Sequence, residues 1–472
     1  MNTFPTVVLL PDGSGVRNFL LGGFMTALAE ENPSLILHQM ADEAVAGFRR
    51  SLGPRTHWAR LQYREPIPSF LLRNALTYAQ LYWARTRSMR FNLRQPSNQS
   101  WRYRTALKTA KALGKLNGSA AGIQRLNRLY RALVKRSPEV GRYRRLFQET
   151  GTEILFCSHQ RTQLAVPAVV AAQSLGIPCV TFIFSWDNLS SKGRIPAPFD
   201  HYLVWSPLMK EELQRYYPDV APDRIHVVGT PQFDPYGDAS VDWGREAFFQ
   251  KIGADSTQPL ICFSGGDSKT CPEDPGHLNI LMELIREGRI KGRPRVILRP
   301  APVDDGRRYQ AVLKRFPEVI HAQPDWYTPR GGDWQQILPT KEDILFLANL
   351  ARHVDLNLNM ASTMTLDFAI HDKPVVNLAF DVADPPLFGA PIWEVYYRFE
   401  HYRPVVELGA ARFARSREEL AQHINDYLAD PGLDRENRRN LVDLQVQGPI
   451  GQAYRRVVDH LTLIRRREQV SP

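Results

Sequence analysis

The sequence predicts an α/β protein made of two doubly wound, Rossmann-like domains that face each other across a cleft, with a basic helical insertion in the first domain. The chain has 472 residues, which is more than one hydrophobic core usually organises. Short apolar runs alternate with helical stretches, a pattern typical of parallel sheets covered by helices. This alternation occurs twice, on either side of the polar residues 235–258.

We therefore expect four segments, namely a first domain, an interdomain connection, a second domain and a C-terminal helical segment, at residues 1–234, 235–258, 259–430 and 431–472. In the first domain, buried apolar runs predict strands at residues 6–10, 35–39, 153–157, 178–184, 201–205 and 224–228. Helices are expected between these strands, at residues 163–175 and 207–216.

The second domain repeats this pattern. Strands are expected at residues 260–263, 295–298, 319–323, 354–358 and 374–379. Helices are expected at residues 277–287, 304–315, 343–351, 364–370 and 417–429. In doubly wound sheets, ligands collect at the carboxyl ends of the strands, so site residues are expected in the loops that follow the predicted strands.

The charge of the chain is unevenly distributed. The net charge is +11, but residues 49–145 hold 23 Lys or Arg against only Glu65 and Glu139, a net +21, and the rest of the chain is acidic. These cations recur among Leu, Tyr and Trp at helical spacing, which predicts a helical insertion at about residues 47–147. Such amphipathic helices fit an anionic membrane surface. A solvated insertion that balances the acidic remainder is the alternative.

Several function classes are disfavoured. No zinc-finger spacing, RNP aromatic signature or basic zipper occurs, so nucleic acid is not the expected partner. Histidines are scattered without an HExxH motif, and we expect no metal and no bound cofactor. Four cysteines without CxxC spacing and the absence of a long apolar run favour a cytoplasmic chain, peripheral at most on the inner face of the membrane.

Hydroxyl side chains follow a buried strand of the second domain. Ser362 and Thr363 stand where a helix begins, and unpaired N–H groups at such a position suit a diphosphate. Asp367, one turn later, is placed to accept hydrogen bonds from a ribose. Ordinary N-capping, with Asp367 as a solvated first-turn carboxylate, is the alternative.

A glycine loop and a cation lie in the same domain. Gly265 and Gly266 directly follow the first strand, where glycine lets backbone N–H groups approach a phosphate. The loop lacks the spacing of a Walker A motif, which disfavours ATPase chemistry. Arg299 ends the second strand and is expected to neutralise a leaving diphosphate, unless it forms a surface ion pair.

Three segments carry a resemblance to known proteins: SWDNLSSKG at residues 185–193, Val204-Trp205, and VGTPQFD at residues 228–234. They resemble bacterial GT-B glycosyltransferases and their relatives, the CDP-glycerol glycerophosphotransferases and nucleotide-sugar epimerases, over about residues 151–234 and 259–400. The resemblance implies a donor-binding second domain in which Ser362, Thr363, Thr365 and Asp367 bind diphosphate and ribose. Relatives often have Arg-Pro-His-Pro after the second strand of that domain, whereas this chain has Ala301 in place of the His.

The implied activity is transfer of a sugar from a nucleotide-sugar donor to a glycan or lipid-linked acceptor, in cell-surface polysaccharide assembly. The catalytic base is expected in the first domain, and the candidates Asp12, His159 and Asp187 all follow predicted strands. Asp187 is the first choice because it lies in the most family-like segment. For Asp187 and His159, roles in stabilising a turn and in structural hydrogen bonding are the alternatives.

The first domain also offers an acceptor site. Gly13, Ser14, Gly15 and Arg17 follow the first strand; Asn18 replaces the third glycine of a dinucleotide fingerprint, so an acceptor loop is favoured over NAD binding. Two alternatives to the glycosyltransferase stay open: a polyol phosphate transferase or nucleotide-sugar epimerase, and a non-enzymatic protein that binds polyanions through the basic helices.

Overall fold

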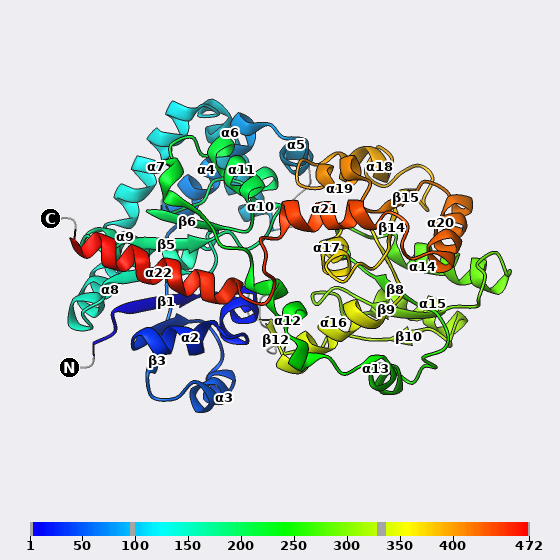
Figure 1. The fold of residues 1–472 in the computed structure, drawn as a ribbon. Coiled ribbons are helices and arrows are strands. Elements are labelled where there is room, and N and C mark those ends of the chain that lie inside the picture. The colour runs from blue at the N-terminus through cyan, green and yellow to red at the C-terminus, as the bar shows by residue number, and fades with distance from the viewer. Residues whose placement is uncertain (1–2, 95–99, 198, 328–336, 471–472) are drawn as a thin grey trace. The chain divides into compact units, whose positions relative to one another are not determined.

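A computed structural model of the chain describes residues 3–94, 100–197, 199–327 and 337–470 (Figure 1). The chain divides into two compact units. The first comprises Met1–Gln232, Thr328–Leu338 and Gln452–Pro472, and the second comprises Phe233–Tyr327 and Pro339–Gly451. The four cysteines are buried and unpaired.

The first unit contains a seven-stranded parallel sheet with the order β3-β2-β1-β4-β5-β6-β7. Its strands are β1 (Thr6–Leu10), β2 (Ser34–His38), β3 (Thr56–Arg60), β4 (Ile154–Cys157), β5 (Cys179–Phe182), β6 (His201–Val204) and β7 (Ile225–Val227). Strands β1, β2, β4, β5 and β6 are buried along their whole length, as their continuous apolar runs predict for strands covered on both faces.

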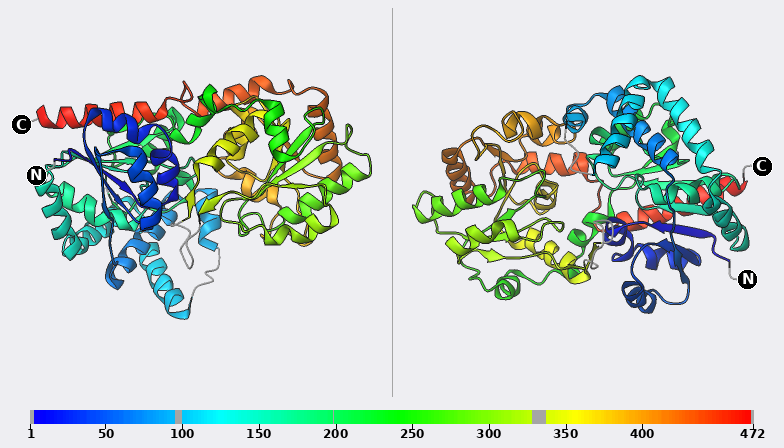
Figure 2. Two further views of the ribbon diagram at one scale, coloured as in Figure 1. Left: turned by 90° about the horizontal axis from the view of Figure 1, so that it is seen from below. Right: turned by 180° about the vertical axis from the view of Figure 1, so that it is seen from behind.

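Helices surround this sheet. Besides α2 (Phe24–Glu31) and α3 (Asp42–Leu52), the unit contains α9 (Val166–Gln173), α11 (Pro207–Tyr216) and the C-terminal α22 (Ala453–Val470). Helix α22, red in Figures 1 and 2, packs against α2 and β4. The described part of the basic insertion contains five helices: α4 (Ile67–Ala84), α5 (Arg87–Arg94), α6 (Trp101–Leu116), α7 (Ala120–Val134) and α8 (Pro138–Glu149).

The second unit contains a six-stranded parallel sheet with the order β10-β9-β8-β13-β14-β15. Its strands are β8 (Leu260–Ser264), β9 (Arg295–Arg299), β10 (Ile320–His321), β13 (Leu356–Asn359), β14 (Val375–Leu378) and β15 (Arg412–Ala414). Its main helices are α13 (Arg245–Ile252), α14 (Asp274–Arg286), α15 (Gln310–Arg315), α16 (Lys341–His353), α17 (Met364–Ala369), α20 (Arg417–Ala429) and α21 (Arg435–Gln445). Apolar side chains from the strands and from α14 and α20 form one core.

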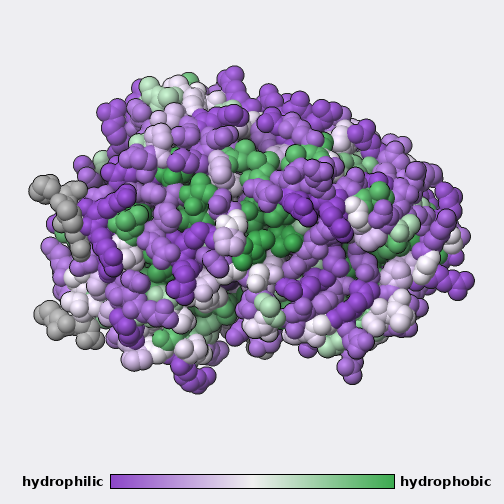
Figure 3. All heavy atoms as spheres, viewed as in Figure 1, coloured by the Kyte–Doolittle hydropathy of each residue, from purple (hydrophilic) through white to green (hydrophobic). Residues whose placement is uncertain are grey.

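Both units therefore have the predicted α/β, Rossmann-like fold. In each sheet the strand order reverses direction once, between β1 and β4 in the first unit and between β8 and β13 in the second. At such a switch point the loops leaving the two neighbouring strands diverge and leave room for a ligand. Hydrophilic residues cover most of the face drawn in Figure 3, as expected when the apolar runs fill the cores.

Some expected boundaries differ from the structure. Residues 56–60, expected in the helical insertion, form the edge strand β3. Most of this strand is only partly buried, so it can carry polar side chains and lacks a continuous apolar run. Residues 235–258 belong to the second unit, where Phe248 and Phe249 of α13 are buried. The expected C-terminal segment 431–472 divides, with α21 in the second unit and α22 in the first.

No helix among the described residues is both long and apolar enough to span a bilayer.

Candidate functional site

The switch point of the first unit is organised by Asp12, which follows β1. Its Oδ1 accepts hydrogen bonds from the backbone N–H groups of Ser14 (3.0 Å) and Gly15 (3.1 Å). Asp12 thereby caps the short helical turn Gly13–Gly15 and fixes the loop that leaves the strand. The side chain is nearly buried, so its second oxygen is held in one direction.

Gly15 allows this loop to touch the loop that follows β4. A Cβ atom at Gly15 would overlap the hydroxyl of Ser158, which itself donates a hydrogen bond to the carbonyl of Leu9 (3.0 Å). Ser158 directly precedes His159 in the chain. The glycine therefore sets the close approach that brings the first residues after β1 and β4 within bonding distance of each other.

Two of the three base candidates meet here. Asp12 Oδ2 is hydrogen-bonded to Nδ1 of His159, and each residue is 5% exposed. Burial opposes ionisation of Asp12, but His159 and the N–H groups of Ser14 and Gly15 outweigh it and hold the pKa of the carboxyl below its usual value. The Nε2 atom of His159 is buried and has no hydrogen-bond partner among the described residues. The carboxylate thus fixes the orientation of the ring through Nδ1.

Asp187, the third candidate, has a different environment. Its Oδ1 accepts hydrogen bonds from Ser185 Oγ (2.5 Å) and Asn188 Nδ2 (2.9 Å), and its Oδ2 accepts one from Ser191 Oγ (2.7 Å). These contacts hold the turn that precedes the short helix α10 (Asn188–Ser191). The geometry matches the structural alternative for Asp187, that of a turn-stabilising carboxylate.

The rest of the expected acceptor loop lies beside this pair. Gly13 is buried and Ser14 is partly exposed. Arg17 is also partly exposed, and its guanidinium donates hydrogen bonds to Gln232 Oε1 (2.5 Å) and Asn18 Oδ1 (3.1 Å). Arg17 thus links the loop after β1 to the loop after β7.

At the switch point of the second unit, the glycines of the loop after β8 serve packing. A Cβ at Gly265 would overlap the hydroxyl of Tyr309, and one at Gly266 would overlap the sulfur of Cys271. Their N–H groups are already bonded, Gly265 to the Arg299 carbonyl (2.9 Å) and Gly266 to Asp274 Oδ2 (2.7 Å). These two N–H groups are therefore not free for a phosphate, contrary to what the sequence suggested.

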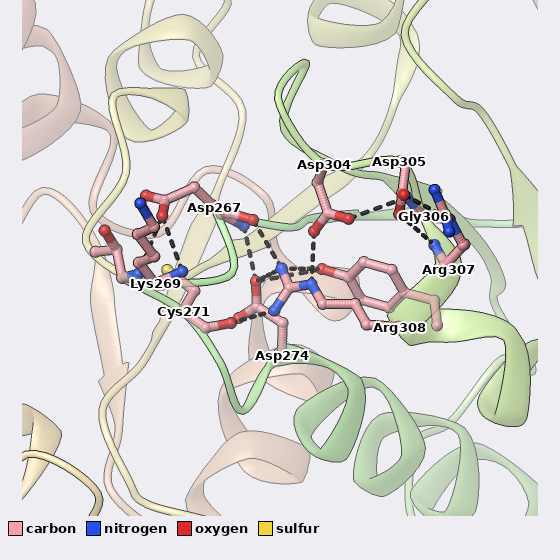
Figure 4. A network of polar contacts seen from close by, with 12 residues as sticks. Asp267, Lys269, Cys271, Asp274, Asp304, Asp305, Gly306, Arg307 and Arg308 are labelled. Atoms are coloured by element: carbon pink, nitrogen blue, oxygen red, sulfur yellow. Dashed lines mark hydrogen bonds and ion pairs between the residues drawn. The ribbon is translucent and has the colours of Figure 1, made fainter. Parts of the chain in front are cut away.

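Arg308, which sequence reasoning missed, holds this loop in place (Figure 4). Its guanidinium donates to the carbonyls of Gly266 (2.7 Å) and Cys271, and it pairs with Asp304 (2.5 Å) and Asp274 (3.3 Å). Burial raises the pKa of Asp274 to about 7, against the opposing effects of the Gly266 N–H and Arg308. One arginine thus ties both ends of the loop to the start of α14.

A buried amide network supports the loop after β13. Asn359 donates hydrogen bonds to Asn357 Oδ1 (2.8 Å) and Thr365 Oγ1 (3.1 Å), and Tyr402 donates one to Asn377 Oδ1 (2.6 Å). The hydroxyls of Thr365 and Tyr402 lie 2.8 Å apart. Thr365 is fully buried in this network, so its hydroxyl positions the loop and does not face a ligand.

The tip of the same loop is accessible. Ser362 and Thr363 are partly exposed, and Ala361 before them has a φ of 47°, an uncommon conformation for a residue with a side chain. Ser362 Oγ accepts a hydrogen bond from the N–H of Met364 (3.3 Å). The hydroxyl and N–H of Thr363 bond to no other described residue. Thr363 therefore offers two free polar groups at the switch point.

The two charged residues expected at the donor site are buried. Asp367 is 3% exposed and accepts a hydrogen bond from the hydroxyl of Tyr236. Arg299 is 6% exposed and donates to both carboxylate oxygens of Asp343 at 2.7 Å, so it forms a buried ion pair and its charge is neutralised. Both side chains are thus engaged by other protein groups.

No protein-family model matches the chain, and no curated protein matches its sequence. Solved structures do match. A UDP-GlcNAc 2-epimerase from Neisseria meningitidis, bound to UDP-GlcNAc, superposes with a TM-score of 0.52 at 10% identity, over 97% of this chain and 99% of that one. A glycosyltransferase from Rickettsia africae gives 0.52 at 10% identity, over 100% of both chains. The chain has the GT-B fold.

The wall teichoic acid polymerase TagF also matches this GT-B chain, with a TM-score of 0.50 at 8% identity, over 99% of this chain and 90% of that one. At these identities the likeness is one of fold. Within the GT-B fold, the described side chains gather at two switch points, one in each unit. The position after a strand end was visible in the sequence for both sites, whereas the hydrogen-bond partners of each side chain were not.

Proposed function

We propose that this chain is a GT-B glycosyltransferase that moves a sugar from a nucleotide-sugar donor to a hydroxyl of a glycan or lipid-linked acceptor. The observation that carries the proposal is the Asp12–His159 pair at the switch point of the first unit. A buried carboxylate bonded to Nδ1, with Nε2 left unpaired, is the arrangement that a general base needs. The GT-B fold supports a nucleotide-sugar substrate by analogy, because the Neisseria epimerase of this fold binds UDP-GlcNAc.

In the proposed reaction, Nε2 of His159 takes the proton of the acceptor hydroxyl. The acceptor oxygen forms a bond to the anomeric carbon, the bond from that carbon to the diphosphate oxygen breaks, and the electron pair leaves with the nucleoside diphosphate. The Asp12 carboxylate stabilises the imidazolium that forms. General base catalysis of this kind contributes roughly 10²–10⁴-fold in rate.

The ring of Phe184 lies beside that of His159. The centroids of His159 and Phe184 lie 4.1 Å apart in an edge-on arrangement, and Phe184 is partly exposed. The acceptor hydroxyl must reach a nitrogen that is enclosed in the structure described here. We infer that the side chain of Phe184 moves aside when the substrate binds, so that the acceptor occupies its position beside His159.

For the donor, the proposal uses the tip of the loop after β13. The hydroxyl and N–H of Thr363 supply donors to a diphosphate oxygen, and Ser362 lies next to it. Thr365 and the Arg308 network do not contact the donor in this proposal. They hold the loops after β13 and β8 in position. Arg299 and Asp367 are not included, since both are engaged in buried contacts.

A sugar epimerase is the second candidate, because UDP-GlcNAc 2-epimerases are among the structures of the same fold. The same histidine could remove a proton from a sugar carbon. TagF among the matches leaves polyol phosphate transfer as a third chemistry for the same base. These activities differ in their products, so product analysis separates them.

The test begins with a panel of nucleotide sugars and CDP-glycerol, screened by thermal shift. The donor that stabilises the chain is then incubated alone and with candidate acceptors. A glycosyltransferase gives nucleoside diphosphate in an acceptor-dependent manner, whereas an epimerase converts the donor alone. If no nucleotide sugar shifts the melting temperature and none is consumed, the proposal is contradicted.

A further inference from the structure

Helix α6 exposes one continuous face of mixed character. Successive residues of this face are separated by three, four, seven and one positions, which places them on one side of a helix. They are Trp101, Arg104, Lys108, Lys115 and Leu116. Trp101 is 66% exposed and Leu116 is 82% exposed, and the three cations between them are also exposed. The 16 residues of α6 include no Asp or Glu. An apolar residue therefore stands at each end of a cationic row.

The opposite face of α6 is packed on α4. The rings of Phe70 and Tyr103 have centroids 5.3 Å apart, and a Cβ at Gly114 would overlap Tyr78 and the backbone of Ala75. Residues near the start of α6 thus meet the start of α4, and residues near its end meet the middle of α4. The two helices are parallel neighbours, and their contact fixes which face of α6 meets solvent.

A further exposed apolar residue lies at the start of this helix pair. Ile67, the first residue of α4, is 74% exposed and lies one helical turn before Phe70. Trp101 lies two residues before Tyr103. Because Phe70 and Tyr103 are in contact, Ile67 and Trp101 mark the same end of the helix pair. Isolated exposed apolar residues are ordinary, but Trp101 and Leu116 adjoin cations on the same face of α6, and Ile67 lies at the end of the helix pair where Trp101 stands.

The cations of this face lack acidic partners. Arg104, Lys108 and Lys115 form no ion pair with any described residue. Glu65, one of two acids in the basic segment, is engaged by Arg73 at 2.7 and 2.8 Å. The unneutralised charge favours an anionic partner.

We propose that this face of α6, with Ile67 at its end, binds an anionic lipid surface. Trp101, Leu116 and Ile67 enter the interfacial layer, and Arg104, Lys108 and Lys115 lie against lipid phosphates. Aliphatic side chains distinguish lipid from nucleic acid, because leucine and isoleucine gain by entering hydrocarbon but do not stack on bases as aromatics do. This inference goes beyond the proposed function and does not depend on it.

The experiment is flotation of the full chain with phosphatidylcholine vesicles that either contain or lack phosphatidylglycerol. One variant combines Lys108→Glu with Lys115→Glu, and a second combines Trp101→Ser with Leu116→Ser. Matched controls come from exposed positions of the second unit: Lys291→Glu with Lys314→Glu, and Val303→Ser with Leu387→Ser. Thermal unfolding of each variant verifies that it is folded.

We expect flotation only with anionic vesicles, weakened by salt, and a loss of at least about tenfold in partitioning for each α6 variant but not for the controls. Equal flotation of the α6 variants and the wild type would overturn the inference. So would tight binding to DNA or RNA in fluorescence anisotropy without binding to anionic vesicles. Donor binding by the α6 variants is expected to be unchanged, which separates this test from that of the proposed function.

Discussion

Asp12 and His159 stand 147 residues apart in the sequence, yet the carboxylate of the first is bonded to Nδ1 of the second at the junction of β1 and β4. The contact depends on the fold in two ways. Strands β1 and β4 are direct neighbours, and Gly15 lets the loops after them approach. The pair is therefore a product of the switch point, where GT-B and other doubly wound folds place ligands.

The role of Asp12 is tested with Asp12→Asn. We expect kcat to fall by about 10²–10⁴-fold, because an amide neither stabilises the imidazolium nor fixes the productive tautomer. Release of nucleoside diphosphate measures the rate. Asp187→Asn is the control, since that carboxylate bonds to hydroxyl and amide groups of its own turn and pairs with Lys192; its main effect is expected on stability. A larger loss of kcat in Asp187→Asn than in Asp12→Asn would contradict this role of Asp12 and favour Asp187 as the catalytic base.

Gly15→Ala tests the approach of the two loops. The added methyl group overlaps the hydroxyl of Ser158, and we expect a loss of about 1–3 kcal/mol in the free energy of unfolding. Gly141→Ala in α8 is the matched control, because nothing lies within 4 Å of its Cβ; it should stabilise the chain slightly. Adding Ser158→Gly to Gly15→Ala should recover part of the loss. Urea unfolding measures all three, and an equal effect at both glycines would refute the packing argument.

Arg308→Lys tests the loop after β8. An ammonium group cannot reproduce the fork that joins Gly266, Cys271 and Asp304, so we expect weaker donor binding and a lower melting temperature. Arg307→Lys, at the neighbouring position, is the control: its side chain is 80% exposed and pairs only with the exposed Asp305 among described residues, so little change is expected. Calorimetric titration of the donor distinguishes the two. Equal donor affinity in both variants would show that the fork does not position the loop.

Acid sensitivity of the second unit is expected from His277. Burial lowers the pKa of His277 to about 4, although its Nε2–H donates a hydrogen bond to the Phe380 carbonyl (2.8 Å). The unfolded chain therefore binds a proton, at a pKa near 6.5, that the folded chain does not bind until about pH 4. The stability is present above pH 6.5 and is lost as the pH falls toward 4, by about 3 kcal/mol. His277→Gln should flatten the dependence of the urea midpoint on pH over this window, and an unchanged slope would contradict the assignment.

The sequence predicted the elements better than the contacts. The expected limits of β1, α11 and α20 are those of the structure, because each is marked by a clear apolar run or a cap such as Ser206 or Ser416. Strand β3 was missed, since an edge strand with polar side chains lacks that signal.

The sequence predicted where the candidate site residues lie along the chain, but not the hydrogen-bond partners of their side chains. Residues after strand ends, such as His159 and Thr363, were identified because topology alone brings strand ends together. Whether a polar side chain faces solvent or another element is decided by distant residues: the hydroxyl that bonds Asp367 comes from Tyr236, 131 residues away. Arg308 follows no strand directly and has no motif, so no local signal marked it.

The most direct test of the account is the single-turnover release of nucleoside diphosphate by His159→Gln, with saturating donor and acceptor. Donor affinity, measured in parallel, should stay within about twofold of the wild type, because His159 belongs to the first unit and the proposed donor groups to the second. We predict a release rate at least about 100-fold lower than that of the wild type. A variant that releases nucleoside diphosphate at the rate of the wild type would contradict the assignment of His159 as the catalytic base.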